Sequence, residues 1–361
     1  MSSRIALLVC LALPGLLHAQ LGGLGVFGDS MSDEYFDFGL GYAKNWVEQA
    51  KLIRNVNVGQ TATQAGQAGG TWGSPRNTGY AANWALAGAT SSSLLGIVNS
   101  NSAAITAQVS SGQITHAVVA IGTNDFSPGS SAWSSIYNGL WSVSQIQTYR
   151  DSVVANITAT VTALQNKGIK VVVASVADYS VAPATRAGYP DAAKRELVTA
   201  AVADVNTYVK LMAQNKHIAY ADLFGMTKQV FGTNAAPNAT VTIGGVVINL
   251  NTQGTAPTNA FAADGIHPQS LLQGSLGSLY LEALRAGYST GVAPLTEQEV
   301  VQLAGLTYTG DTLPFTSSQF VVSFVPEPAS VAMVSLAVIA GLGYLFWRRA
   351  ATRRALDQQV A

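Results

Sequence analysis

Short apolar runs alternate along the chain with longer segments in which apolar residues recur at helical spacing. The short runs predict buried strands at residues 24–27, 116–121, 169–176 and 217–223. The longer segments predict helices at residues 44–54, 145–166 and 191–215. Strands that alternate with helices usually pair in parallel, and the helices then cover both faces of the sheet. The pattern therefore predicts an α/β fold with a parallel central sheet.

Three other segments depart from this alternation. Residues 241–248 form two β-branched runs around Gly244-Gly245, which predicts a hairpin inserted late in the domain. Residues 59–79 are rich in Gly, Thr, Gln and Ala, which is typical of a long surface loop. Residues 306–325 are interpreted as a linker that follows the domain.

The first 19 residues have the layout of a secretory signal peptide. Arg4 precedes an apolar stretch at residues 5–17, and Ala19 stands before the expected cleavage point. The stretch is too short to cross a bilayer. The only cysteine of the chain, Cys10, lies in this segment. The mature protein is therefore expected to have no disulfide, thiol nucleophile or cysteine metal site.

The C-terminal segment indicates a second step of export. Pro326-Glu327-Pro328 leads into an apolar stretch at residues 329–347, and four arginines follow by residue 354. About 19 such residues can cross a membrane as a helix, with the arginines on the cytoplasmic side. One interpretation is a permanent single-span anchor. In their order, the three parts at residues 326–354 resemble the PEP-CTERM sorting signal of Gram-negative bacteria, which implies cleavage by an exosortase.

The charge of the chain argues against a nucleic-acid partner. The formal net charge is zero, with 19 basic and 19 acidic residues. Residues 20–325, between the two terminal segments, are slightly acidic and contain no basic stripe. Only 11% of the residues are charged. Uncharged polar residues take their place, a composition compatible with an exported bacterial protein.

Gly28-Asp29-Ser30 directly follows the first predicted strand. At a turn between strand and helix, the Ser30 hydroxyl would be presented above the sheet, and its backbone N–H would be free to bind an oxyanion. The alternative is a common Ser/Asp helix cap.

Two further blocks could supply oxyanion donors. Gly88 stands among small residues, so the backbone can approach a ligand closely and its N–H could be a second oxyanion donor; the alternative is a tight loop that needs no side chain. Asn124 stands in the turn after the second predicted strand, and its side-chain amide could donate a third hydrogen bond. The alternative for Asn124 is an Asx turn.

Asp264-x-x-His267 is the candidate base element. In a turn, Asp264 can hold the His267 ring in one orientation. His116 and His217 each start an apolar strand and are interpreted as strand-edge residues. No carboxylate or histidine cluster has metal-ligand spacing, so neither a metal nor another cofactor is expected.

These four blocks, in this order, resemble the SGNH/GDSL hydrolase family. The resemblance runs from about residue 24 to residue 280, and Met31 stands where the family name has leucine. It implies a single flavodoxin-like three-layer α/β/α domain, placed here at residues 20–305. It also implies Ser30 as nucleophile, Asp264 and His267 as its partners, and Ser30, Gly88 and Asn124 as the oxyanion hole. The chain has no Gly-x-Ser-x-Gly, the motif of the ordinary α/β-hydrolase nucleophile turn.

The sequence thus predicts a secreted serine esterase or lipase. The expected substrate is a small-molecule, lipid or acylated-carbohydrate ester, and the expected place is the cell surface or extracellular matrix after an inner-membrane-tethered precursor. Two alternatives stay open: a non-catalytic matrix protein on the same scaffold, and a carbohydrate acetylesterase. Trp133, Tyr137 and Trp141 recur at helical spacing and line either the substrate pocket or the core.

Overall fold

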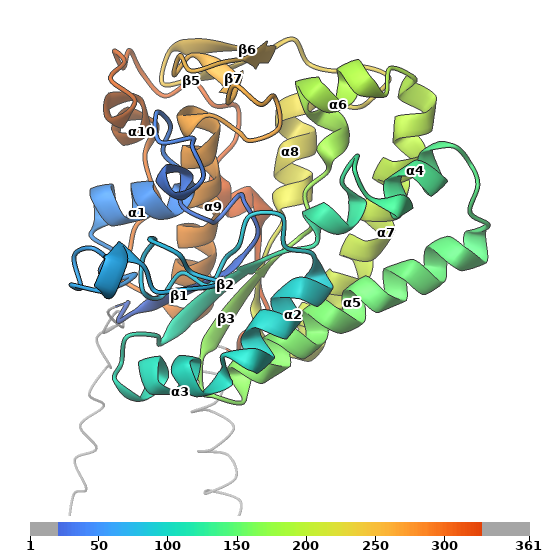
Figure 1. Ribbon diagram of the computed structural model, residues 1–361. Coiled ribbons are helices and arrows are strands. Elements are labelled where there is room, and N and C mark those ends of the chain that lie inside the picture. Colours follow the sequence, from blue (N-terminus) through green and yellow to red (C-terminus); the bar gives the residue numbers. More distant parts are fainter. Residues whose placement is uncertain (1–20, 327–361) are drawn as a thin grey trace, which may run out of the picture.

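The central sheet contains the four predicted strands. The computed structural model describes residues 21–326. Its parallel strands β1 (Leu24–Gly28), β2 (His116–Ala120), β3 (Lys170–Ala174) and β4 (Ala219–Ala221) lie side by side in that order (Figure 1). Almost all of their residues are buried, as expected for apolar runs covered on both faces. The predicted parallel sheet is confirmed.

The sheet continues beyond β1 through an extended segment at residues 82–84. The Val26 N–H donates to the Ala82 carbonyl at 3.0 Å, and the Trp84 N–H donates to the Val26 carbonyl at 2.7 Å. Val26 and Asn83 form a parallel bridge. The free edge of β1 is therefore paired, and the chain segment that leads to Gly88 leaves from this edge.

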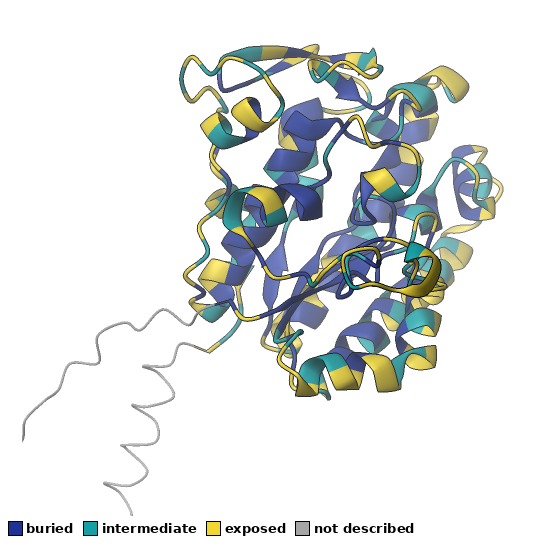
Figure 2. Ribbon diagram, turned by 60° about the vertical axis from the view of Figure 1, so that its left-hand side comes forward, coloured by how far each residue is buried: buried dark blue, intermediate teal, exposed yellow. Residues whose placement is uncertain are grey.

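Apolar side chains of the strands alternate between two helical layers. On one face, Val26, Val118 and Val172 pack against helices α1 (Trp46–Arg54), α8 (Leu223–Phe231) and α9 (Ser270–Tyr288). On the other face, Val119 and Val173 pack against helices α2 (Ser91–Ser100), α3 (Ser102–Ser110), α5 (Val143–Gln165) and α7 (Ala192–Asn215). Figure 2 shows the buried residues concentrated on the sheet and on the inner sides of these helices. The predicted three-layer α/β/α architecture is confirmed.

Capping side chains set the ends of the predicted helices. Asn45 and Ser142 each form a capping box, which starts α1 two residues later and α5 two residues earlier than the apolar spacing indicates. The Asp191 carboxylate accepts the N–H groups of Ala193 and Lys194 at the start of α7. Polar caps lie outside the apolar period, so periodicity alone misplaces these boundaries.

A small second sheet lies at one end of the molecule, beside α8 and α9 (Figure 1). Strands β5 (Thr240–Ile243) and β6 (Val246–Gln253) form the predicted hairpin, whose turn residues Gly244 and Gly245 have φ of +60° and +84°. A third strand, β7 (Asn259–Phe261), pairs in parallel with β6. This short strand was not expected, and it leads directly into the turn of Asp264 and His267.

The prediction of a linker at residues 306–325 is wrong. Strand β8 (Val321–Ser323) pairs antiparallel with β4 and completes the central sheet. Phe315 is buried in the core, which helix α10 (Glu297–Leu303) also joins through Val301. The burial of Phe315 and the pairing of β8 with the β4 backbone hold this segment on the domain.

The predicted signal peptide at residues 1–19 and nearly all of the predicted sorting signal at residues 326–354 lie outside the described residues. Between residues 21 and 326, no helix has both the length and the apolarity that membrane crossing requires. The predicted membrane span at residues 329–347 is outside this range.

Candidate active site

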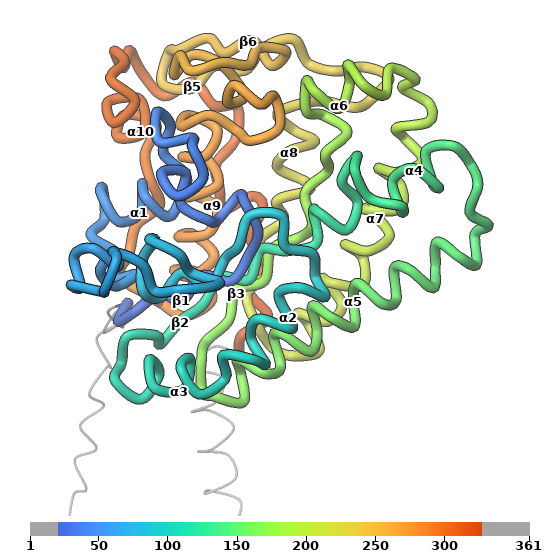
Figure 3. Tube along the Cα trace, viewed as in Figure 1, coloured from blue at the N-terminus to red at the C-terminus, as the bar shows by residue number. Residues whose placement is uncertain are grey.

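Three of the predicted site residues lie in loops that leave the central sheet at the carboxyl ends of its strands, whereas Asp264 and His267 follow β7 of the small second sheet. Ser30 follows β1, Gly88 follows the extended segment beside β1, and Asn124 follows β2. Parallel strands end at one edge of a sheet, so these loops gather there, and their course is traced in Figure 3.

Ser30 lies in a tight turn directly after β1. The Asp29 carbonyl accepts the N–H groups of Ser32 and Asp33, both at 2.9 Å, and the Asp29 carboxylate accepts the Met31 N–H at 3.0 Å. Ser30 is buried, with 4% of its surface exposed. The turn closes on Asp29, so it fixes the backbone direction at Ser30.

Asp29 is a buried carboxyl group beside the predicted base. Burial raises the pKa of Asp29 to about 6, and the hydrogen bond from Met31 and the charge of His267 act in the opposite direction. Its Oδ2 atom is buried without a hydrogen-bond partner among the described residues. The pKa of the buried Asp29 carboxyl group therefore depends on the charge of the His267 ring.

Asp264 and His267 form a direct pair, as predicted. The Oδ2 atom of Asp264 lies 2.5 Å from Nδ1 of His267, and its Oδ1 atom accepts the N–H groups of Ile266 and His267 at 2.9 and 3.0 Å. Burial acts to raise the pKa of Asp264, but its hydrogen bond with His267 and the ring's charge outweigh burial and lower it. Asp264 therefore faces the ring as an anion and fixes Nδ1 as the protonated nitrogen.

The turn that carries this pair requires Gly265. Its φ is +67°, and a Cβ atom there would collide with the Gln253 side chain at the end of β6. The Ala262 N–H also donates to the His267 carbonyl at 2.7 Å, which closes the turn. The inserted sheet thus sets the position of the Asp264–His267 pair.

Two aromatic rings that the sequence did not single out pack against His267. The Phe38 and Tyr35 rings lie 5.5 and 6.0 Å from the His267 ring, centroid to centroid. The Nε2 atom of His267 is buried and has no hydrogen-bond partner in residues 21–326. With Nδ1 engaged by Asp264, this is the ring nitrogen left to accept a proton.

Asn124 lies at the start of a short 3₁₀ turn after β2. Its Nδ2 donates to the Ala89 carbonyl at 3.0 Å, and its Oδ1 accepts from the Tyr179 hydroxyl at 3.3 Å. The next residue, Asp125, accepts the backbone N–H and hydroxyl of Ser91 at 2.7 and 2.8 Å. Asn124 and Asp125 thus tie the β2 loop to the segment that carries Gly88.

Gly88 lies on the exposed surface of that segment, with φ of +80°. The preceding Ala87 N–H donates to the Asp33 carboxylate at 2.8 Å, and the following Ala89 carbonyl accepts from Asn124. Gly88 is therefore held between the loops of Ser30 and Asn124. The structure brings all the predicted oxyanion donors into connected loops.

Tyr179 is a site residue that the sequence analysis missed. It follows β3, only 6% of its surface is exposed, and its hydroxyl donates to Asn124 Oδ1 at 3.3 Å, while the Ser30 side chain is close enough to act on its pKa. The signal that could have found it is its place after the third parallel strand, where ligands of open α/β sheets bind.

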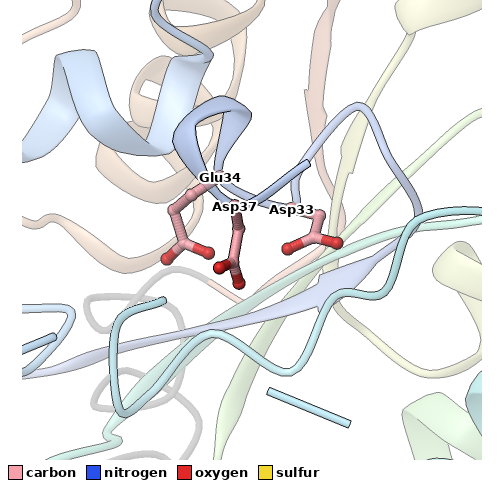
Figure 4. A group of neighbouring side chains, drawn as sticks. All are labelled: Asp33, Glu34 and Asp37. Atoms are coloured by element: carbon pink, nitrogen blue, oxygen red, sulfur yellow. The ribbon is translucent and has the colours of Figure 1, made fainter. Parts of the chain in front are cut away.

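The structure also assembles an acidic cluster that the sequence analysis did not predict. The carboxylates of Asp33, Glu34 and Asp37 lie within 4.8 Å of one another and point the same way from the segment after β1 (Figure 4). Three carboxylates are a donor set that a cation can use. Each one already accepts a backbone N–H, from Ala87, Tyr80 and Thr78 respectively. Burial raises the pKa of Asp33 to about 7 and that of Glu34 to about 8. Through these hydrogen bonds the three carboxylates connect the segment after β1 with the chain at residues 78–87.

The other two histidines lie away from the site. His116 is buried at the start of β2, the opposite end of the strand from Asn124, and burial lowers its pKa to about 4. His217 lies in the turn after α7, two residues before β4, with φ of +53°. Both positions agree with the interpretation of strand-edge residues.

The predicted aromatic face is part of the core. Helix α4 (Ser131–Tyr137) buries Trp133 and Tyr137. Both rings pack against Tyr189, which directly follows helix α6 (Pro183–Gly188). Because α4 ends at Tyr137, Trp141 belongs to the following segment, where its ring contacts Tyr149. The core alternative is therefore correct for Trp133 and Tyr137, whereas Trp141 is only partly buried against the core.

Comparison with known protein families gives one match over most of the chain. The family model described as GDSL-like Lipase/Acylhydrolase matches residues 24–273, more than half of the chain. Comparison with curated proteins gives no match.

Solved structures give distant matches. One is a GDSL-like lipase from Bacteroides thetaiotaomicron (16% identity, TM-score 0.39, covering 73% of this chain and 88% of that one). Another is an extracellular lipase from Streptomyces rimosus (17% identity, TM-score 0.38, covering 74% of this chain and 99% of that one). On the family match, the chain belongs to the GDSL-like lipase/acylhydrolase family.

Proposed function

We propose that the protein is an exported serine esterase that hydrolyses carboxylic esters of short or medium chain length. The family implies an ester-hydrolysing enzyme of the esterase or lipase type. The observation that carries the finer proposal is the 2.5 Å contact between Asp264 and His267, which leaves the buried Nε2 atom to act as a base.

In the proposed first step, His267 Nε2 takes the hydroxyl proton of Ser30 as Ser30 Oγ attacks the ester carbonyl carbon. The tetrahedral intermediate collapses, the C–O bond to the alcohol breaks, and His267 returns the proton to the departing oxygen. Water then attacks the acyl-enzyme with His267 as its base, which releases the carboxylic acid and restores Ser30.

The carbonyl oxygen becomes negatively charged in both steps. The donors proposed for it are the backbone N–H groups of Ser30 and Gly88 and the side-chain amide of Asn124. Support comes from the hydrogen bonds that hold the loops of these residues together through Asp33 and Ala89. Donors fixed before the reaction need no rearrangement when the charge develops.

The proposed location follows from the terminal segments. Residues 1–19 would direct export, and residues 326–354 would tether the precursor to the inner membrane of a Gram-negative bacterium until an exosortase releases it to the cell surface or matrix. Support comes from the order of Pro-Glu-Pro, apolar stretch and arginines. The ester substrate would then be met outside the cell.

Hydrolysis of p-nitrophenyl esters tests the proposal. Ser30→Ala is expected to reduce turnover by at least about 10³-fold, because no other group can form the acyl-enzyme. Ser110→Ala, at an exposed serine at the end of α3, is the matched control and should leave turnover unchanged. Hydrolysis by Ser30→Ala at the rate of the unmodified protein would refute the mechanism.

A further inference from the structure

The hydroxyl of Tyr179 lies between two residues of the candidate site. It donates to Asn124 Oδ1 at 3.3 Å, and the Ser30 side chain lies close enough to act on its pKa. We propose that Tyr179 is a positioning residue, whose hydroxyl holds the Asn124 amide with an Nδ2–H directed at the oxyanion. This inference rests on the proposed function, in which Asn124 is an oxyanion donor.

The two ends of the Asn124 amide have partners of opposite kind. Tyr179 donates to Oδ1, while Nδ2 donates to the Ala89 carbonyl at 3.0 Å. A flipped amide would place Oδ1 against that carbonyl, oxygen against oxygen, and would lose the bond that Nδ2 makes there. The Ala89 carbonyl occupies one of the two Nδ2 protons, so the second remains for the substrate. Without the Tyr179 hydroxyl, only the Ala89 contact orients the amide.

The Tyr179 hydroxyl can hold the Asn124 amide in one orientation because it has a single proton to donate. When that proton is given to Asn124, the Tyr179 oxygen can only accept hydrogen bonds. Burial raises the pKa of Tyr179 far above its usual range, so the hydroxyl keeps its proton at neutral pH. A neutral tyrosine therefore supports the amide without adding a competing charge near Ser30.

The segment that carries Tyr179 is fixed to helix α7. The Asn206 side chain donates to the Val176 carbonyl at 2.9 Å and accepts the Val176 N–H at 2.7 Å. Asp178 accepts from the Thr199 hydroxyl at 2.5 Å. Three bonds to one long helix leave Tyr179 little freedom, which a positioning residue needs in order to act on another side chain.

The first test is the Tyr179→Phe variant, which keeps the ring and its packing and removes the hydroxyl. Its kcat is expected to fall about 5- to 30-fold with KM unchanged, because the oxyanion contact forms only in the transition state. Tyr189→Phe is the matched control, since it removes a hydroxyl that donates to the Pro128 carbonyl at 2.8 Å outside the site. Its kcat should stay within about 2-fold of the unmodified protein. An unchanged kcat in Tyr179→Phe would overturn the proposal.

The decisive test combines Tyr179→Phe with Asn124→Ala. If Tyr179 acts through the amide, adding Tyr179→Phe to Asn124→Ala should lower kcat less than about 2-fold further. Full additivity of the two losses would overturn the inference, since Tyr179 would then act independently of Asn124. Failure of the proposed function gives a different result: Ser30→Ala would keep its activity, whatever the outcome of this cycle.

Discussion

At the scale of single residues, the environment of His267 decides which of its nitrogens can act as a base. Asp264 holds Nδ1 at 2.5 Å, and the rings of Tyr35 and Phe38 confine the imidazole. The free Nε2 atom is buried, so proton transfer there takes place away from bulk water. In the proposed mechanism, the carboxylate acts by fixing the tautomer and by stabilising the imidazolium ion that would form.

The Asp264→Asn variant tests this role. An amide can keep the turn but can also hold the wrong tautomer, so turnover of a p-nitrophenyl ester is expected to fall about 10³- to 10⁴-fold. Asp151→Asn, at an exposed carboxylate on α5, is the control and should be without effect. A loss of less than about 10-fold in Asp264→Asn would mean that this carboxylate does not orient the base.

Residue chemistry could be predicted where a side chain has few other uses. Ser30, Asn124, Asp264 and His267 stand in polar turns at the ends of apolar runs, and their types match acyl-transfer roles. Tyr179 could not be identified in this way, because a tyrosine near an apolar run is compatible with simple core packing. Its role depends on contacts with Asn124 and Ser30, which lie 55 residues or more away along the chain.

At the scale of elements, apolar patterns predicted the four parallel strands and helices α1, α5 and α7, but neither the 19-residue helix α9 nor the short pairings. β7 and β8 each have three residues, too few to show a period, and they are defined by backbone pairing with β6 and with the distant β4. β8 contributes more to the domain than β7 does, because it pairs with the outer edge of β4. The segment before β8 also buries Phe315. The domain therefore extends beyond the boundary at residue 305 that the sequence indicated.

Truncation of the chain tests whether the domain ends at residue 305 or continues to residue 326. A chain of residues 20–305 lacks β8 and Phe315, and its free energy of unfolding is expected to fall by about 3 to 6 kcal/mol relative to residues 20–326. Urea unfolding of the two chains, followed by circular dichroism, measures the difference. Equal midpoints and slopes would show that residues 306–326 do not contribute to the stability of the domain.

At the scale of the whole molecule, buried carboxyl groups make the stability depend on pH. Burial raises the pKa of Glu34 to about 8, well above its ordinary value of 4.5. Between these values the folded protein binds more protons than the unfolded chain. The free energy of unfolding therefore decreases as the pH rises from about 4.5 to about 8. Asp29 and Asp33 act in the same direction over narrower ranges.

In the Glu34→Gln variant, the free energy of unfolding should decrease less as the pH rises. Glutamine keeps a carbonyl oxygen to accept the Tyr80 N–H and has no proton to lose. Urea unfolding at pH 5 and pH 8 is the measurement, and Glu196→Gln, at an exposed glutamate on α7, is the control. A decrease as large in Glu34→Gln as in the unmodified protein would show that Glu34 is not the source.

The overall architecture could be predicted because strand–helix alternation and two-sided burial specify it. The assembly of the site could be predicted only as a set of residues, because its contacts join loops as far apart as Asp264 and Ser30. Those contacts depend on the exact turns at Asp29 and Gly265, and on the inserted sheet beside the Asp264–His267 pair. Such details arise from tertiary structure.

The proposed mechanism requires Ser30 to be an activated nucleophile. Reaction of the protein with a fluorophosphonate, followed by mass spectrometry of its peptides, measures this directly, since only a serine activated by a base reacts readily. We predict one adduct, on Ser30, and at least about 10²-fold slower labelling in His267→Ala. An unlabelled Ser30, or an adduct on another serine at the same rate, would contradict the account.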